Sequence, residues 1–316
     1  MVKIKSLTAG YGKVEVVKNV NITLNEGEIT GIIGASGSGK STFLKTLAAK
    51  VVAFKGSLQI DTELIDLSEQ LLVAERKSVY LVDQEFDLMP YLNVFDNIKK
   101  NHLHLSEATI KKGVAKSARH VKLAKQKEQQ AKTLSGGQKQ RTALAAAFLG
   151  DAALCLFDEP FSHLDFDLKQ QVRALIKEQS AHRHTLIALH EPADFLSLCD
   201  TLVVLKNGRI LQQGSPFEIY HHPKNQYVAG LSGYYCCPSD ALLAEFSFTK
   251  TSIIRPDHLE ISKKKGIDAV VQRSVHFGMY YLIDVEVKGE NLLVFNNKAL
   301  AEGTKVKILK SENAPD

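Results

Sequence analysis

Residues 34–41 constrain this chain more than any other stretch, because they fit the pattern G-x-x-x-x-G-K-[ST]. A strand-like apolar run, 28–33, precedes them, and a helix-like run, 42–50, follows. Their three glycines let the backbone curl so that N–H groups point at a polyphosphate, and the helix dipole favours the same anion. Lys40 is expected to bridge terminal phosphates and Ser41 to bind Mg²⁺. A flexible Gly/Ser turn is the alternative, which the strand–loop–helix context disfavours.

Length and composition are those of an ordinary globular protein with room for two domains. The chain has 316 residues, of which 44% are hydrophobic and 24% charged. It has no uncharged apolar run of about 18 residues and no apolar signal-peptide core near Met1. The four cysteines show no metal-ligand spacing, so we expect a reducing, cytoplasmic compartment. The net charge of +5 permits contact with an anionic surface without requiring nucleic acid.

The sequence pattern changes along the chain. Strand-like and helix-like runs alternate up to Pro223, and short β-like runs separated by turns recur after it. We therefore expect a boundary near residue 235. Residues 106–132 are predicted to be helical and are strongly basic. A solvated helix face explains that charge, and a patch facing anionic lipid or a partner is the alternative. The absence of interleaved aromatic residues argues against single-stranded nucleic-acid binding.

Asp158 and Glu159 follow a continuous apolar run, 153–157, that is typical of a buried parallel strand. In a chain with a phosphate-binding loop, the first carboxylate is suited to holding Mg²⁺. The second is suited to orienting and deprotonating an attacking water. An ordinary acidic loop is the alternative, because adjacent acidic residues at strand ends are common. Their occurrence together with Lys40 favours a hydrolytic site.

Ser135, Gly136 and Gly137 open another helix-like run and form a second candidate anion site. An N-cap role would explain Ser135. It does not explain the two glycines, whose bare N–H groups suit close approach to a phosphate. Because one chain already has a complete cradle, the second one predicts phosphates held between two chains.

These motifs resemble, in order, those of the ATP-binding cassette (ABC) ATPases over roughly residues 1–230. Residues 134–138, LSGGQ, resemble the family signature, and Gln140-Arg141 continue it. Residues 157–165 resemble its Walker B motif and D-loop. The resemblance implies an α/β P-loop NTPase cassette, with a mixed sheet core and a helical subdomain at about 85–150. The cassette would occupy 1–235, and a small all-β, barrel-like domain would occupy 236–316.

The resemblance also implies a role for each matching position, with ATP and Mg²⁺ as cofactors. Tyr11 would stack on adenine, although a loop aromatic is the alternative. Gln84 falls at the Q-loop and His190 at the switch that contacts the γ-phosphate; alone, either would be structural. The expected catalytic residues are Glu159 as general base, His190 and Gln84, and the expected metal ligands are Ser41, Gln84 and Asp158. The expected nucleotide contacts are Tyr11, Gly34, Ala35, Ser36, Gly37, Ser38, Gly39, Lys40, Ser41, Thr42, Ser135, Gly136, Gly137, Gln138 and Asp165, with Asp165 also connecting the two sites of a dimer.

Three positions depart from the family pattern. His163 stands where the D-loop usually has alanine, and Glu191 follows His190 where aspartate is commoner. Ala147 occupies a place where arginine is frequent. None of these departures removes a group expected to act in hydrolysis, so they concern the dimer interface.

The C-terminal part narrows the class. Residues 205–216 and 218–220 look like the end of importer cassettes, and 254–259 resemble the opening of a TOBE-type β domain. An ordinary turn is the alternative for Arg255-Pro256. The resemblance implies the ATPase subunit of an importer, working as a homodimer. It would lie peripherally at the cytoplasmic face of the cell (inner) membrane, with an integral membrane permease and, indirectly, an extracytoplasmic solute-binding protein as partners.

The expected solute is iron(III) or another ion, with polyamine, sulfate, molybdate or sugar as alternatives. The apolar stretch 88–92 would dock the permease. The rival class is a soluble ABC ATPase acting on nucleic acid or ribosomes. Such proteins usually carry two cassettes or a long coiled coil, and neither pattern occurs in this sequence. We therefore expect no nucleic-acid partner.

Overall fold

The computed structural model describes residues 1–316 except 70–77, 103–105, 151, 250, 313 and 315–316. Contacts divide the chain into a first unit, Met1–Pro216, and a second unit, Phe217–Asp316. This division lies earlier than the boundary expected near residue 235. Within the described ranges, no helix combines the length and the apolar character needed to cross a membrane.

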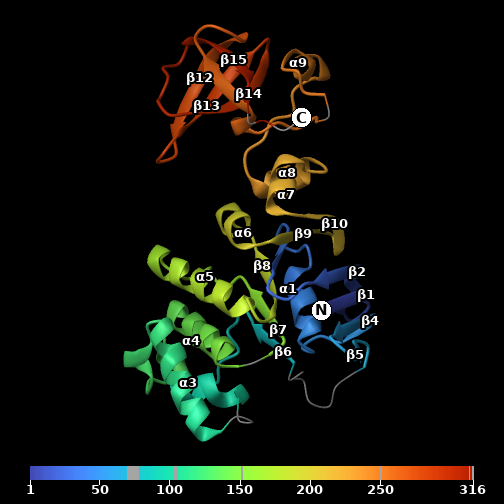
Figure 1. Cartoon of the computed structure of the whole chain (residues 1–316), viewed down its shortest axis with the longest axis vertical. Coiled ribbons are helices and arrows are strands. Elements are labelled where there is room, and N and C mark those ends of the chain that lie inside the picture. The colour runs from blue at the N-terminus through green and yellow to red at the C-terminus, as the bar shows by residue number, and fades with distance from the viewer. Residues whose placement is uncertain (70–77, 103–105, 151, 250, 313, 315–316) are drawn as a thin grey trace. The chain divides into compact units, whose positions relative to one another are not determined.

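A six-stranded sheet lies in the first unit, with the strand order β10-β9-β3-β8-β7-β6 (Figure 1). Its neighbouring strands are parallel, apart from the antiparallel pair of β9 and β10. β3, β7 and β8 are buried along their whole length, which explains their continuous apolar sequences. The bounds are β3 Ile29–Ile33, β6 Val79–Val82, β7 Leu154–Asp158, β8 His184–Leu189, β9 Thr201–Lys206 and β10 Arg209–Gly214.

A second, antiparallel sheet of the first unit has the order β2-β1-β4-β5. Helix α1 (Lys40–Leu47) contacts strands of both sheets. Its Phe43, Leu44 and Leu47 are fully buried in a core that both sheets share. The phosphate loop is therefore held at the start of a helix fixed on two sides. The bounds are β1 Val2–Tyr11, β2 Val14–Leu24, β4 Ala53–Ile60 and β5 Glu63–Asp66.

The chain between β6 and β7 is helical. It contains α2 (Val94–Lys99), α3 (Glu107–His120) and α4 (Gly136–Leu149), and both α2 and α3 pack on α4. The basic helix expected over 106–132 is shorter than predicted: α3 ends at His120. Lys122 adopts a positive φ of 55° there, and short 3₁₀ turns follow. These turns are η2 Ala124–Gln126 and η3 Ala131–Thr133, while η1 Lys100–His102 follows α2; after β7 come α5 Phe166–Ser180 and α6 Pro192–Leu198.

The second unit contains a five-stranded antiparallel sheet with the order β11-β15-β12-β13-β14. Its edge strands β11 and β14 approach each other, so the sheet curls, and the fold class expected for the C-terminal part is confirmed as antiparallel β. The bounds are β11 Leu259–Ser262, β12 Ile267–His276, β13 Tyr281–Val287, β14 Glu290–Asn296, β15 Lys305–Lys310, α7 Pro216–His221, α8 Gln226–Ser232, α9 Asp240–Glu245 and the 3₁₀ turn η4 Pro256–His258.

Arg255 explains why residues 217–234 belong with this second unit. Its side chain is 1% exposed, and its guanidinium stacks on the ring of Tyr220 at 4.5 Å from the centroid. It donates hydrogen bonds to four main-chain carbonyls and one hydroxyl: those of Tyr220 (2.9 Å), Ala229 (2.9 Å), Gly233 (3.2 Å), Tyr234 (3.1 Å) and Ser232 Oγ (2.7 Å).

Candidate functional site

The loop between β3 and α1 requires glycine at two positions. A Cβ on Gly34 would lie 2.4 Å from the carbonyl oxygen of Leu205, which is too close for any side chain. Gly39, the residue before α1, has a φ of 106°, a conformation that L side chains rarely adopt. Ser38 is buried, and its hydroxyl has no hydrogen-bond partner within the described residues. The loop thus offers a polar group that a bound anion would satisfy.

Lys40 folds back over this loop. Its Nζ donates to the carbonyl oxygens of Gly34 at 2.7 Å and Ala35 at 3.3 Å. Burial lowers the pKa of Lys40, while the negative charges of Glu159 and Asp158 oppose that shift. The structure therefore brings the loop lysine into the field of both carboxylates that the sequence singled out.

Asp158 ends strand β7 and is 2% exposed. Neither of its carboxylate oxygens has a hydrogen-bond partner of standard geometry among the described residues. Burial raises the pKa of Asp158, and the nearby Ser41 hydroxyl acts to lower it. A buried, unsatisfied carboxylate beside a hydroxyl fits a hard cation with oxygen ligands, which would satisfy both groups.

Glu159 and His190 meet at the ends of two neighbouring parallel strands, β7 and β8. Glu159 Oε2 lies 3.4 Å from His190 Nδ1. Glu159 has a positive φ of 51°, and its N–H donates to the carbonyl oxygen of Ala188 at 3.1 Å. Glu159 therefore adopts a left-handed backbone conformation, which is uncommon for a non-glycine residue, at the position where its carboxylate faces the histidine.

The comparisons with known proteins agree with this geometry. Residues 17–162 match the family model described as ABC transporter. The chain is 38% identical to the glucose import ATP-binding protein of Saccharolobus solfataricus over 227 residues, covering 70% of this chain and 64% of that protein. A solved dimeric ATP-binding cassette in a post-hydrolysis state, bound to ADP and Pi, superposes with a TM-score of 0.62 at 25% identity. That match covers 68% of this chain and 99% of the solved chain.

The chain carries a domain of the ABC transporter family. A further relative is the spermidine/putrescine import ATP-binding protein of Clostridium acetobutylicum, which is 28% identical; the match covers 97% of this chain and 93% of that protein. The chain spans less than two thirds of the length of the glucose import protein and of a maltose/maltodextrin import ATP-binding protein of Vibrio vulnificus. The P-loop cassette predicted from residues 34–41, 134–138 and 157–165 is confirmed as the fold of this ABC domain.

The ABC signature begins helix α4. Ser135 is the N-cap: its Oγ accepts from the N–H of Gln138 at 3.3 Å, and Gln138 Oε1 accepts from the N–H of Ser135 at 2.9 Å. The N-cap alternative for Ser135 is thus correct as a local description. The N-cap role does not explain why residue 137 is a glycine. A Cβ at this position would lie 2.9 Å from the carbonyl oxygen of His163. The glycine permits close packing of the signature on the D-loop of the same chain.

Gln140, which sequence reasoning did not single out as a site residue, joins the signature helix to the Walker B end. It is 1% exposed. Its Nε2 donates to the carbonyl oxygen of Glu159 at 3.3 Å and to Ser162 Oγ at 3.4 Å, and its Oε1 accepts from the N–H of His163 at 3.2 Å. The only sequence signal for this contact was its place two residues after the LSGGQ run.

The remaining predicted residues lie around these strands. Tyr11 ends β1 with 54% of its side chain exposed, as an adenine-stacking residue would need. Gln84 is exposed two residues after β6. Asp165 is the N-cap of α5, its Oδ1 accepting from the N–H of Leu168 at 2.9 Å. Their functional roles stay predictions.

Two features of the site were missed from the sequence. Asp83 is buried beside Gln84, and its carboxylate oxygens lie 3.5 Å from Lys45 Nζ and 3.4 Å from Lys50 Nζ. Lys169 of α5 lies 2.6 Å from Glu191 Oε2 and 2.8 Å from an oxygen of the buried Asp194. Because Glu191 follows His190 directly, Lys169 ties α5 to the switch histidine.

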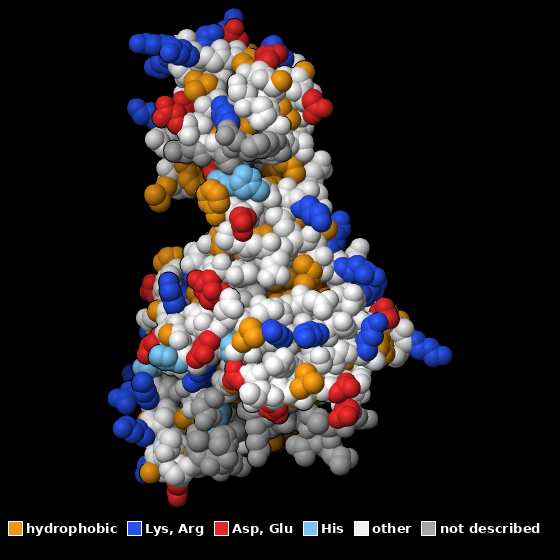
Figure 2. Space-filling view, turned by 45° about the vertical axis from the view of Figure 1, so that its right-hand side comes forward, with side chains coloured by type: hydrophobic (Ala, Val, Ile, Leu, Met, Phe, Trp, Pro, Cys, Tyr) orange, Lys and Arg blue, Asp and Glu red, His pale blue; other side chains and the backbone are white. Residues whose placement is uncertain are grey.

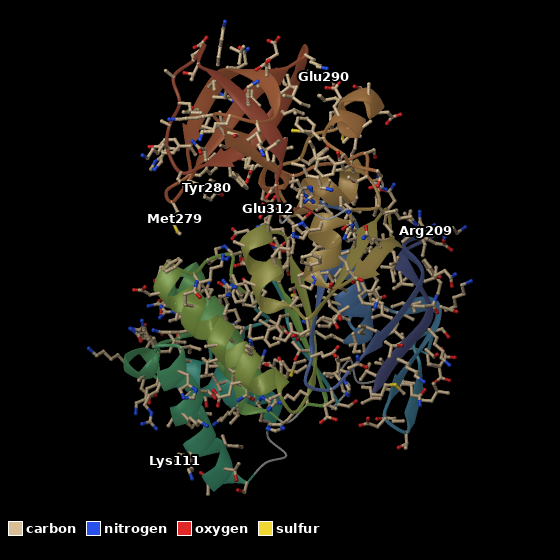
Figure 3. The ribbon with its side chains drawn as sticks, turned by 45° about the horizontal axis from the view of Figure 1, so that its top comes forward. Lys111, Arg209, Met279, Tyr280, Glu290 and Glu312 are labelled. Carbon is tan, nitrogen blue, oxygen red and sulfur yellow. The ribbon has the colours of Figure 1, made fainter. Side chains whose placement is uncertain are left out.

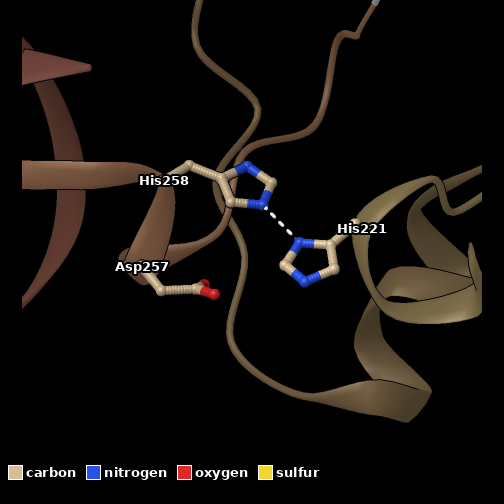
Figure 4. A group of neighbouring side chains, drawn as sticks. All are labelled: His221, Asp257 and His258. Atoms are coloured by element: carbon tan, nitrogen blue, oxygen red, sulfur yellow. Dashed lines mark hydrogen bonds between the residues drawn. The ribbon is translucent and has the colours of Figure 1, made fainter. Parts of the chain in front are cut away.

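A separate group of titratable side chains lies in the second unit. His221, Asp257 and His258 bring their ligand atoms within 4.8 Å of one another (Figure 4). His258 Nδ1 accepts from the N–H of Arg255 at 3.2 Å, so its proton lies on Nε2, which donates to His221 Nδ1 at 3.0 Å. Burial lowers the pKa of His258 to about 4. The pair is therefore a neutral hydrogen-bonded contact, and a metal on His258 Nε2 would have to break the bond from Arg255.

Proposed function

We propose that this protein is the ATP-hydrolysing subunit of an importer. The observation that carries the proposal is the meeting of three groups at one edge of the parallel sheet. Lys40 lies on the phosphate loop, the unsatisfied carboxylate of Asp158 lies at the end of β7, and Glu159 faces His190 across β7 and β8. Phosphoryl transfer to water needs charge stabilisation, a cation site and a base, in that arrangement.

In this proposal the loop 34–41 binds the phosphates of ATP. Lys40 exchanges its bonds to the loop carbonyls for bonds to terminal phosphate oxygens, and Ser38 offers its free hydroxyl. Ser41 and Asp158, with Gln84, would hold Mg²⁺, which fits the unsatisfied oxygens of Asp158 and supplies charge neutralisation when bound. Tyr11 offers an exposed ring for adenine.

Glu159 is the proposed general base. Its carboxylate accepts the proton of the attacking water, while His190, 3.4 Å from Glu159, contacts the γ-phosphate and keeps the carboxylate oriented. The ATP-contacting glycines of the signature, together with Ser135 and Asp165, would act across a homodimer. The solved dimeric cassette that this chain resembles supports that arrangement.

The transported solute is proposed from relatives, and they do not support the iron(III) expectation. The relatives include import ATP-binding proteins for glucose, for maltose or maltodextrin, and for spermidine or putrescine. We favour a polyamine, because the spermidine/putrescine relative matches 97% of this chain and so includes the second unit, whereas the glucose relative matches 70%. A sugar is the second candidate, supported by the higher identity of the glucose relative.

Two experiments test the proposal. Co-purification with a two-subunit membrane permease supports an importer, whereas retention by ribosomes or DNA contradicts it. Uptake of labelled spermidine, maltose and iron(III) is then measured in membranes that contain the permease and its binding protein. ATP-dependent uptake of spermidine supports the polyamine assignment, and uptake of maltose alone transfers it to the sugar class.

A further inference from the structure

The net positive charge of this chain arises from one segment of the first unit. Residues 106–132 hold eight Lys and Arg against two Asp and Glu, a formal charge of +6 in a chain whose whole charge is +5. All other residues together therefore sum to −1. We call these eight side chains the basic surface: Lys111, Lys112, Lys116, Arg119, Lys122, Lys125, Lys127 and Lys132.

Helix α3 presents half of this charge on one face. Its buried positions are Ile110, Val114, Ser117 and Ala118, which face α4 and the core. The four basic residues of α3 are exposed and fall within an arc of about 140° on the opposite side, at 100° per residue. Figure 3 shows Lys111 at the outer end of this helical region. In Figure 2, several Lys and Arg side chains gather at the lower left, near the height where Figure 1 places α3.

The basic surface is largely unneutralised. Within the described residues, Lys127 forms an ion pair with the adjacent Glu128 at 3.9 Å, and both side chains are mostly exposed. Such a pair contributes little and is easily exchanged. The segment ends beside exposed apolar side chains, since Lys132 lies 4.8 Å over the ring of Tyr91, which is 74% exposed, and its N–H donates to the carbonyl oxygen of Pro90.

We propose that the basic surface binds an anionic lipid membrane. Seven of the eight residues are lysines. A lysine acts as a point charge toward a diffuse negative surface, whereas an arginine guanidinium can bind a single phosphate through two hydrogen bonds. No aromatic residue lies within 106–132, which disfavours stacking on nucleic-acid bases. The contact would hold the first unit at the bilayer independently of a permease.

The test uses the purified full chain without nucleotide, so that it does not depend on the proposed ATPase role. Flotation is measured with vesicles of phosphatidylcholine, with and without phosphatidylglycerol, at low and high salt. The triple variant Lys111→Glu/Lys112→Glu/Lys116→Glu alters the face of α3. The matched control is Lys263→Glu/Lys264→Glu/Lys265→Glu, which makes the same charge change at three exposed lysines of the second unit.

We expect the parent to bind only the vesicles with phosphatidylglycerol, and high salt to weaken that binding. At about 1 kcal/mol for each lysine near the surface, the α3 variant should lose on the order of 100-fold in partitioning. The control should bind like the parent. Equal loss in both variants, equal binding to neutral vesicles, or binding of RNA at the same salt without binding of vesicles would overturn the proposal. Lys→Gln substitutions at 111, 112 and 116, with circular dichroism, separate lost binding from lost folding.

Discussion

Replacement of Arg255 by methionine should destabilise the packing of segment 217–234 against the rest of the second unit. Arg255 is buried and donates to four carbonyls and one hydroxyl of that segment at 2.7–3.2 Å. Methionine keeps part of the volume and removes every donor. A buried carbonyl left without a donor costs about 1–3 kcal/mol. If only two of the four cannot reach water, the local free energy of opening falls by about 2–6 kcal/mol.

Amide hydrogen exchange is the suitable assay, because it reports local opening where two-state unfolding of a two-unit chain does not apply. The expected loss corresponds to a fall in the protection of α8 amides of about 30-fold to 10⁴-fold. Arg273→Met is the matched control, since Arg273 is 70% exposed and pairs with Asp284 at the surface. That substitution should cost less than about 1 kcal/mol. If the α8 amides are equally protected from exchange in Arg255→Met and Arg273→Met, the assigned role of Arg255 is wrong.

Three further predictions concern the ATP site. Glu159→Gln should bind ATP, hydrolyse it about 10²- to 10⁴-fold more slowly and accumulate as a dimer on gel filtration; a parent rate would remove Glu159 as the base. Because burial lowers the pKa of Lys40, its charge is lost at a lower pH than for an ordinary lysine, so ATP affinity should fall before the pH reaches 10.5. Titrated ATP binding checks this, and Lys40→Arg should show no such fall. Lys169→Met should lower kcat by up to about 100-fold with little change in KM for ATP, because it displaces His190. Lys169→Arg should restore most of kcat, whereas Lys177→Met on the same helix should behave like the parent.

The sequence predicted the parts of this fold that local chemistry determines. Residues 34–41 allow few backbone paths, because glycine is required where φ is positive or where a Cβ would meet a neighbouring carbonyl. The strand that ends at Asp158 is buried on both faces, so its apolar run was readable directly. Both features depend on neighbouring residues in the sequence, so they can be predicted without knowledge of tertiary contacts.

The parts that were missed depend on contacts between residues far apart in the sequence. Helix α3 ends at His120, and the carbonyl oxygens of the next two residues, Val121 and Lys122, accept from Arg141 Nη1 of α4 at 3.3 Å each. The boundary expected near 235 followed a change in sequence pattern and stays a prediction. The contacts divide the chain before Phe217, and Arg255 contributes to that division by donating to the carbonyl oxygen of Tyr220, more than thirty residues earlier. Gln140 likewise gains its role only where α4 meets the end of β7.

The departure at Glu191 shows how such contacts account for an unusual residue. Aspartate is commoner after the switch histidine, and glutamate is longer by one methylene group. Here Glu191 uses that length to reach Lys169 at 2.6 Å, while the same Lys169 Nζ lies 2.8 Å from the buried Asp194. Lysine side chains have a single charged atom, so both carboxylates must converge on one point. Burial raises the pKa of Asp194, and the positive charges of Lys169 and of Arg173, 3.7 Å away, oppose that shift. A change at residue 191 is therefore coupled to residue 169, and through it to the orientation of His190 toward Glu159.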